Sequence, residues 1–142
     1  MINPRAIIVD NNQFFREDFK SILENEFSSI VIASLDNVKD LFNLNDAACA
    51  DLIFINLAIA RGTGFQTIKK FIWETPNIKV IGINAYFFEQ LYLLQLIEIG
   101  FKGCIDSNNI YNELDEAIDK VMNGGVFFTN SITSINIQNP KL

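Results

Sequence analysis

The run Leu52-Ile53-Phe54-Ile55-Asn56 gives the first indication of the fold, because four apolar residues in succession end in one polar side chain. A continuous apolar run of this length is typical of a parallel strand that is covered on both faces. In open α/β sheets, functional groups collect beyond the carboxyl ends of such strands, where Asn56 stands. A carboxylate at that place binds metals or accepts phosphoryl groups, whereas an amide forms no acyl phosphate and adds no charge to hold a cation. The run therefore indicates a catalytic scaffold whose chemistry has been removed.

Short apolar runs alternate with helix-length segments along the whole chain. The expected strands are Ala6–Val9, Ile30–Ala33, Leu52–Ile55, Val80–Ile83 and Gly103–Ile105. Apolar residues at helical spacing predict five helices, around residues 15–27, 38–42, 65–72, 86–99 and 114–121. Five βα units in succession predict a parallel sheet with helices on both faces and a cleft at the ends of the first and third strands. We expect one domain over residues 1–128, followed by a polar tail or linker over residues 129–142.

The composition fits one compact domain of 142 residues and excludes several kinds of chemistry. A net charge of −6 makes the chain a poor ligand for the nucleic-acid backbone. The chain has no histidine, so histidine-based acid–base chemistry and Ser–His or Cys–His catalysis are excluded. Cys49 and Cys104 lack CxxC spacing, which favours two reduced thiols over a disulfide, a redox role or a zinc site. With no signal-like or membrane-spanning stretch, we expect a soluble cytoplasmic protein with no cofactor and no enzymatic activity.

The helix expected over residues 86–99 differs from the others because it is apolar nearly all round. Such a helix is either fully buried or meets a partner, and an outer helix of so small a domain cannot be fully buried. A protein–protein interface is therefore favoured over an unusually apolar free surface. The candidate contact residues are Tyr86, Phe87, Phe88, Leu91, Tyr92 and Leu96.

Five segments, in chain order, resemble the receiver domains of response regulators in two-component signalling. They are residues 8–17, 52–64, 79–85, 100–107 and 117–128. The first resembles the family's acidic pair with the helix start that follows it, and the second resembles the phosphoacceptor strand with its loop. The ordered set covers about residues 5–128 and is most similar to the NarL/LuxR branch, which carries a LuxR-type helix-turn-helix output domain. The resemblance implies a flavodoxin-like α/β fold with five parallel strands in the order 2-1-3-4-5 and five helices.

Most of the positions that carry the family's chemistry are occupied by other residue types. The acidic pair, the phosphoacceptor, the hydroxyl residue, the lysine and the switch aromatic correspond to Asp10 with Asn11, Asn56, Asn84, Ser107 and Cys104. One carboxylate and two amides attract Mg²⁺ far less than three carboxylates do. Without the lysine or the metal, nothing neutralises the charge that develops in phosphoryl transfer. These departures imply a pseudo-receiver that binds neither Mg²⁺ nor beryllofluoride and takes no phosphate from small-molecule donors.

The polar residues of this pocket have two interpretations each. Asp10 either binds a weak cation or caps local backbone N–H groups, and capping is the commoner role of a single carboxylate at a strand end. Asn11, Asn56, Asn84 and Ser107 either form a neutral ligand pocket or a hydrogen-bonded plug that locks one conformation. Because no cationic group is nearby to hold an anionic ligand, the plug is favoured.

The leading hypothesis is an atypical receiver that signals by protein–protein contact, most simply by homodimerisation through helix 4, strand 5 and helix 5. In a full-length regulator such a domain would control a DNA-binding output domain in transcription regulation, although these residues alone would not bind DNA. The alternatives are a stand-alone adaptor that docks onto a histidine kinase or another regulator, and a sensor of small neutral ligands. An enzyme is the weakest hypothesis, because no nucleophile–base pair or metal site can be assembled.

Overall fold

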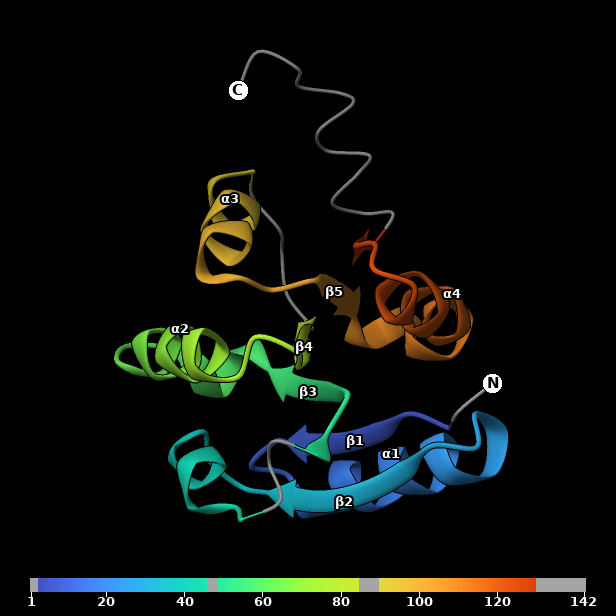
Figure 1. Cartoon of the computed structure of the whole chain (residues 1–142). Helices are drawn as coiled ribbons and strands as arrows, with labels where there is room; N and C mark the ends of the chain where they lie inside the picture. Colours follow the sequence, from blue (N-terminus) through green and yellow to red (C-terminus); the bar gives the residue numbers. More distant parts are fainter. Residues whose placement is uncertain (1–2, 46–48, 85–89, 130–142) are drawn as a thin grey trace.

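In the computed structural model, which describes residues 3–45, 49–84 and 90–129, six parallel strands form one sheet in the order β2-β1-β3-β4-β5-β6 (Figure 1). The strands are β1 (Arg5–Val9), β2 (Ile30–Leu35), β3 (Leu52–Asn56), β4 (Lys79–Asn84), β5 (Gly103–Asp106) and β6 (Phe127–Phe128). The predicted parallel sheet and the strand order 2-1-3-4-5 are confirmed. The sixth strand was not predicted. It pairs with Gly103 and Cys104 of β5 and adds one strand at that side of the sheet.

The described residues form four α-helices and three 3₁₀ segments, where the sequence predicted five helices. The helices are α1 (Gln13–Glu26), α2 (Gly64–Glu74), α3 (Gln90–Ile99) and α4 (Ile110–Met122), so the expected helices four and five are α3 and α4. The 3₁₀ segments are η1 (Lys39–Asn43), η3 (Leu57–Ala60) and η4 (Ser107–Asn109). The prediction of an α-helix around residues 38–42 is wrong in type, because this part of the chain forms the 3₁₀ segment η1.

Local hydrogen bonds of polar side chains explain why η1 does not extend into an α-helix. The Asn37 side chain accepts from the backbone N–H of Asp40 at 3.0 Å and donates to its carboxylate at 2.9 Å. Asn43 donates to the same carboxylate at 3.4 Å. Short Asn and Asp side chains that bond locally compete with helical hydrogen bonding and favour tight turns.

Helices cover both faces of the sheet, and each face forms its own apolar core. Figure 1 shows α2 and α3 on one side of the sheet, with α1 and α4 on the other. Alternate residues of β1 point to opposite cores: Ile7 and Val9 pack toward α2 and α3, while Ala6 and Ile8 pack toward α1 and α4. Because β1, β3 and β4 are buried on both faces, their continuous apolar sequence is accounted for.

The register of β1 and β3 sets the position of the candidate site. Val9 lies opposite Ile55. The residues that follow them, Asp10 and Asn56, therefore lie side by side where the strands have their C-terminal ends, which is the carboxyl edge of the sheet. This edge is where an open α/β sheet places its functional groups, and it agrees with the cleft predicted at the ends of the first and third strands.

The folded region continues one residue beyond the predicted boundary at residue 128. Thr129 is buried; its N–H donates to the carbonyl of Cys104 at 2.8 Å and its hydroxyl to Glu113 Oε2 at 2.8 Å. Thr129 therefore belongs to the domain and not to the tail. The remainder of the expected tail, residues 130–142, lies outside the described residues.

Candidate functional site

Asp10 follows β1 directly and is buried, with 4% of its surface exposed. Its Oδ1 accepts the backbone N–H of Asn12 at 2.8 Å, and its Oδ2 accepts the amide Nδ2 of Asn56 at 3.1 Å. Both carboxylate oxygens therefore already have a donor within the protein. This arrangement supports the capping role expected for Asp10 over a role in holding a cation.

Asn56 ends β3 and uses both ends of its amide. Its Nδ2 donates to Asp10, while its Oδ1 accepts the backbone N–H of Ala58 at 2.9 Å and so caps η3. The two bonds tie the end of β3 to the end of β1 and to the segment that leads into α2. A carboxylate at this position would keep the cap but would lose the donor that faces Asp10.

The start of α1 closes the site on the β2 side. Asn12 caps the helix, since its Oδ1 accepts the N–H of Phe15 at 3.2 Å. Arg16 donates from Nη1 to the main-chain carbonyl of Asp10 at 2.6 Å and from Nε to the Ser34 hydroxyl at 2.9 Å. Arg16 was not among the predicted site residues, yet it holds the backbone that carries Asp10.

A cavity of 250 Å³ lies among these groups, lined by Asp10, Asn11, Asn12, Phe15, Asn56, Ile83 and Ser107. Four of the five predicted pocket residues are therefore brought together, and Asn12, Phe15 and Ile83 are additional lining residues. The fifth, Asn84, ends β4 with its backbone paired to Asp106, but its side chain lies outside the described residues. Among the described residues, the cavity lining contains one carboxylate and no lysine or arginine.

The receiver resemblance implies Mg²⁺ at this edge, and the donor set fits that ion poorly. Mg²⁺ requires near-octahedral coordination by hard oxygens and favours carboxylates. The only carboxylate in the described part of the cavity lining is Asp10, whose two oxygens already accept hydrogen bonds. Over the described residues, no group of three His, Cys, Asp or Glu side chains lies close enough to hold a metal ion.

Cys104, at the switch-aromatic position, is completely buried in β5 within the core formed with α2 and α3. Burial raises the pKa of its thiol strongly, and the neighbouring Glu113 and Asp106 carboxylates add to the shift. Burial, with a smaller contribution from Cys104, raises the pKa of Tyr92 on α3 to about 12, against a lowering effect of Arg61. Both groups therefore stay neutral and act here as packing residues near neutral pH.

The candidate contact residues of the helix expected over residues 86–99 divide into three groups. Tyr86, Phe87 and Phe88 lie outside the described residues, as does the side chain of Leu91. Tyr92 is half-buried, with its ring 6.2 Å from that of Phe65. Leu96 is 0% exposed because it packs into the core, so its inclusion among the contact residues was wrong.

Two residues of α3 that were not among the predicted contact residues expose large apolar side chains. Leu94 is 51% exposed and Ile97 is 49% exposed. An all-apolar helix gives no periodic signal for its inner face, which is why the sequence did not separate these residues from Leu96. None of the helices in the described part of the chain has the length and apolar character needed to span a membrane.

Comparison with known proteins identifies relatives over most of the chain. The family model described as "Response regulator receiver domain" matches residues 6–119. The transcriptional regulatory protein DegU of Brevibacillus brevis is 24% identical over 129 residues, which cover 91% of this chain and 54% of DegU. The chain thus spans about half the length of the curated relatives that it matches.

Solved structures show the same fold at low sequence identity. A LuxR-family two-component response regulator from Aurantimonas sp. SI85-9A1 superimposes with a TM-score of 0.86 at 16% identity, covering 99% of this chain and 100% of that one. A structure of two RcsB dimers bound to two parallel DNAs gives a TM-score of 0.82 at 17% identity, covering 95% of this chain and 68% of RcsB.

Proposed function

Since the chain belongs to the response regulator receiver domain family and is related to LuxR-type regulators, we propose that it is a receiver that signals without phosphorylation. In this proposal the domain has no catalytic activity and transmits its state by contact with other proteins. The observation that carries it is the hydrogen bond from Asn56 Nδ2 to Asp10 Oδ2, at 3.1 Å.

The donor of this hydrogen bond, Asn56, stands where the resemblance places the phosphoacceptor. An amide nitrogen is not a nucleophile toward phosphorus, and here it donates a hydrogen bond to the Asp10 carboxylate. The lining residues that the structure describes also include no lysine or arginine to stabilise an incoming phosphoryl group. The pocket therefore lacks the acceptor, the metal-binding charge and the cation that phosphoryl transfer requires.

The hydrogen-bond pattern favours a plug over a ligand site. Asp10 and Asn56 satisfy each other and the backbone N–H groups of Asn12 and Ala58. A volume of 250 Å³ also falls below the range of about 300–1,000 Å³ that is usual for small-molecule pockets. The plug links the ends of β1 and β3 to the start of α1 and to η3, and so holds one arrangement of the edge that phosphorylation would otherwise rearrange.

Association with a second copy of the chain is the simplest way for a domain held in one conformation to signal. The face made by α3, β5 and α4 exposes Leu94 and Ile97 on α3 and Tyr111 on α4, which is 71% exposed. Exposed apolar side chains of this size favour association between proteins. A homodimer formed through this face would bring together the segments that follow two copies of Thr129.

In a longer protein, the domain would then control a DNA-binding output domain. DegU is named as a transcriptional regulatory protein, and RcsB binds DNA as a dimer in its solved structure. The acidic receiver would act in this arrangement as the dimerisation and partner-binding part, and a separate basic domain would contact DNA.

The proposal is tested by incubating the domain with acetyl phosphate and Mg²⁺ and measuring its intact mass. A receiver with a complete acidic pair, acceptor, hydroxyl residue and lysine serves as the positive control. We expect no adduct on this chain, and no change in its NMR amide shifts when beryllofluoride is added. A stoichiometric, acid-labile phosphoadduct would overturn the proposal. Light scattering tests the dimer separately: a Leu94→Glu, Ile97→Glu variant should be monomeric at concentrations where the wild type is dimeric.

A further inference from the structure

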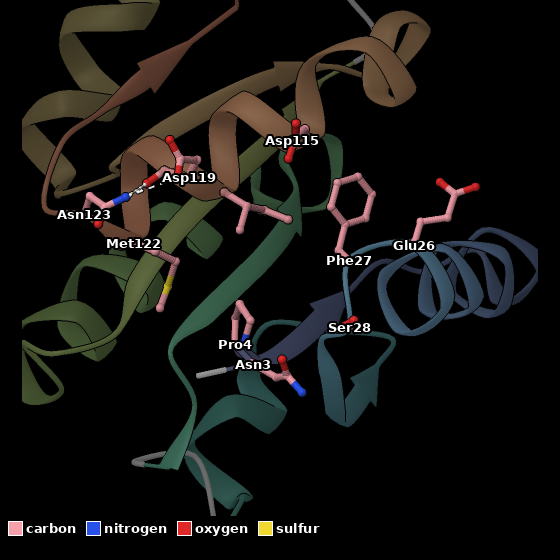
Figure 2. Close-up of a pocket in the computed structure, with 10 residues that line it drawn as sticks. Asn3, Pro4, Glu26, Phe27, Ser28, Asp115, Asp119, Met122 and Asn123 are labelled. Atoms are coloured by element: carbon pink, nitrogen blue, oxygen red, sulfur yellow. Dashed lines mark hydrogen bonds between the residues drawn. The ribbon is translucent and has the colours of Figure 1, made fainter. Parts of the chain in front are cut away.

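A second cavity, of 480 Å³, lies at the opposite end of the sheet from Asp10, between the last turns of α1 and α4 (Figure 2). Asn3 and Pro4, which precede β1, form its base, whereas Asp10 follows the same strand. Figure 2 shows Glu26 and Phe27 at the end of α1 and, across the cavity, Asp115 and Asp119 on α4. The pocket is separate from the polar cavity of the carboxyl edge, and the proposed signalling mechanism makes no use of it.

The rim of this cavity is strongly negative. Glu26, Asp115 and Asp119 contribute three carboxylates, and no lysine or arginine is found among the lining residues of the described chain. Over the described residues, Lys120 forms an ion pair with Glu116 at 2.7 Å. No ion pair in that part of the chain involves Glu26, Asp115 or Asp119. The nearest basic residue on α4 is thus already engaged outside the cavity.

The position of these carboxylates is electrostatically unfavourable. Both α1 and α4 end at the cavity, and the carboxyl end of a helix carries partial negative charge. Glu26 is the last residue of α1, which has no basic residue in its last turn. Asp119 lies in the last turn of α4, where it accepts a hydrogen bond from Asn123 and where Lys120 pairs with Glu116. Acidic side chains at two converging helix carboxyl ends reduce stability, and a cationic partner would relieve that cost.

The inner surface of the cavity is apolar. Pro4 and Ile118 are buried beneath it, while Phe27 and Met122 are half-buried and face the opening. An apolar floor under an acidic rim matches a group that has an aliphatic stem and a cationic head, which is the form of a lysine or arginine side chain. The volume is sufficient for such a side chain together with an adjacent apolar one.

From this arrangement we infer that the cavity is a docking site for a basic, amphipathic segment of a partner protein. Its lysine or arginine stems lie against Phe27 and Met122, and their charged heads meet Glu26, Asp115 and Asp119. A second copy of the chain is a poor occupant, because a symmetric contact would place two acidic rims against each other. Charge complementarity therefore selects a basic partner over self-association at this face.

The test uses the whole chain and a fluorescein-labelled helical peptide of 14 residues composed of lysine and leucine in an amphipathic pattern. Binding is measured by fluorescence anisotropy at 150 mM salt, with a glutamate–leucine peptide of the same pattern for comparison. The pocket variant carries Glu26→Gln, Asp115→Asn and Asp119→Asn. The matched control carries Asp18→Asn, Glu74→Gln and Glu98→Gln, three exposed residues outside the cavity, so the net charge changes equally.

We expect the pocket variant to lose about tenfold in affinity for the basic peptide and the control to lose about twofold or less. The pocket variant should also unfold at a higher temperature than the wild type, because it removes unpaired charge from two helix ends. In NMR titrations, the largest amide shifts should fall on the residues that line the cavity.

Three results would overturn the inference. An equal loss of affinity in both variants would show general attraction to an acidic protein. A pocket variant that unfolds at a lower temperature would show that the carboxylates serve the fold itself. A wild-type dimer that is lost or strengthened only in the pocket variant would assign the face to a second copy of the chain.

Discussion

Replacing Asn56 by aspartate should destabilise the domain at pH 7, because it places two carboxylates where an amide now donates to Asp10 at 3.1 Å. Two unit charges about 4 Å apart repel by roughly 4 kcal/mol at the effective dielectric constant of about 20 that suits protein sites. The substitution also removes a hydrogen bond to a charged group, worth about 1.5–3 kcal/mol. The new side chain keeps the bond to the Ala58 N–H and rotates partly away from Asp10, so we expect a net loss of about 2–4 kcal/mol.

The assay is urea unfolding followed by far-ultraviolet circular dichroism in the presence of EDTA. Trp73 is 85% exposed, so its fluorescence would change little on unfolding. The midpoint should fall by about 1–2 M urea. Asn56→Ala serves as the control, because it removes both amide bonds without adding charge and should cost about 1–2 kcal/mol.

The pH dependence separates charge repulsion from lost packing. Two adjacent carboxylates take up a proton more readily when folded than when unfolded, so the folded Asn56→Asp variant binds more protons as the pH falls. Its deficit relative to the wild type should therefore shrink between pH 7 and about pH 5, whereas the Asn56→Ala deficit should stay constant. An Asn56→Asp variant as stable as the wild type at pH 7 would refute the hydrogen-bonded plug.

Three further outcomes follow from other parts of the structure. Gly103→Ala should cost about 1–3 kcal/mol in a thermal melt, because the added Cβ would lie 2.7 Å from a backbone carbonyl of β6 and force that strand away. Thr129→Val should cost about 1–3 kcal/mol, because it leaves the buried Glu113 carboxylate without the hydroxyl that donates at 2.8 Å; an unchanged melting temperature would contradict this. A disulfide reagent at pH 8 should label one thiol per native chain, the exposed Cys49, and two after denaturation, because burial raises the pKa of Cys104 and blocks access to it. Rapid labelling of both thiols in the native state would show that the β5 core opens readily.

The parts of the fold that the sequence predicted well are those where many residues carry the same signal. The apolar runs of β1, β3 and β4 are four or more residues long and buried on both faces, so burial and strand propensity agree. The meeting of Asp10 with Asn56 then follows from parallel register alone. The plug was expected as one of two interpretations of Asn11, Asn56, Asn84 and Ser107. Of these four, Asn56 forms side-chain hydrogen bonds to Asp10 and to the Ala58 N–H, and the plug as a whole stays a prediction.

The parts that the sequence missed depend on interactions between distant residues. β6 has two residues, too few for any periodic pattern, and it exists because β5 offers a free edge. Leu96 and Leu94 are identical residues two positions apart, and only packing against the sheet buries one and exposes the other. Arg16 gave no signal either, since its bonds to the Asp10 carbonyl and to Ser34 require the folded β1 and β2.

The attachment of Thr129 has a mechanical consequence for the chain that follows it. A pull on that chain acts first on the bonds from Thr129 to Cys104 and Glu113, and on the short pairing of β6 with β5. These few bonds lie at the edge of the sheet, so they yield before the central strands do. Tension from the following segment would therefore reach β5 and α4 directly, while Asp10 and Asn56, on β1 and β3, remain shielded from the load.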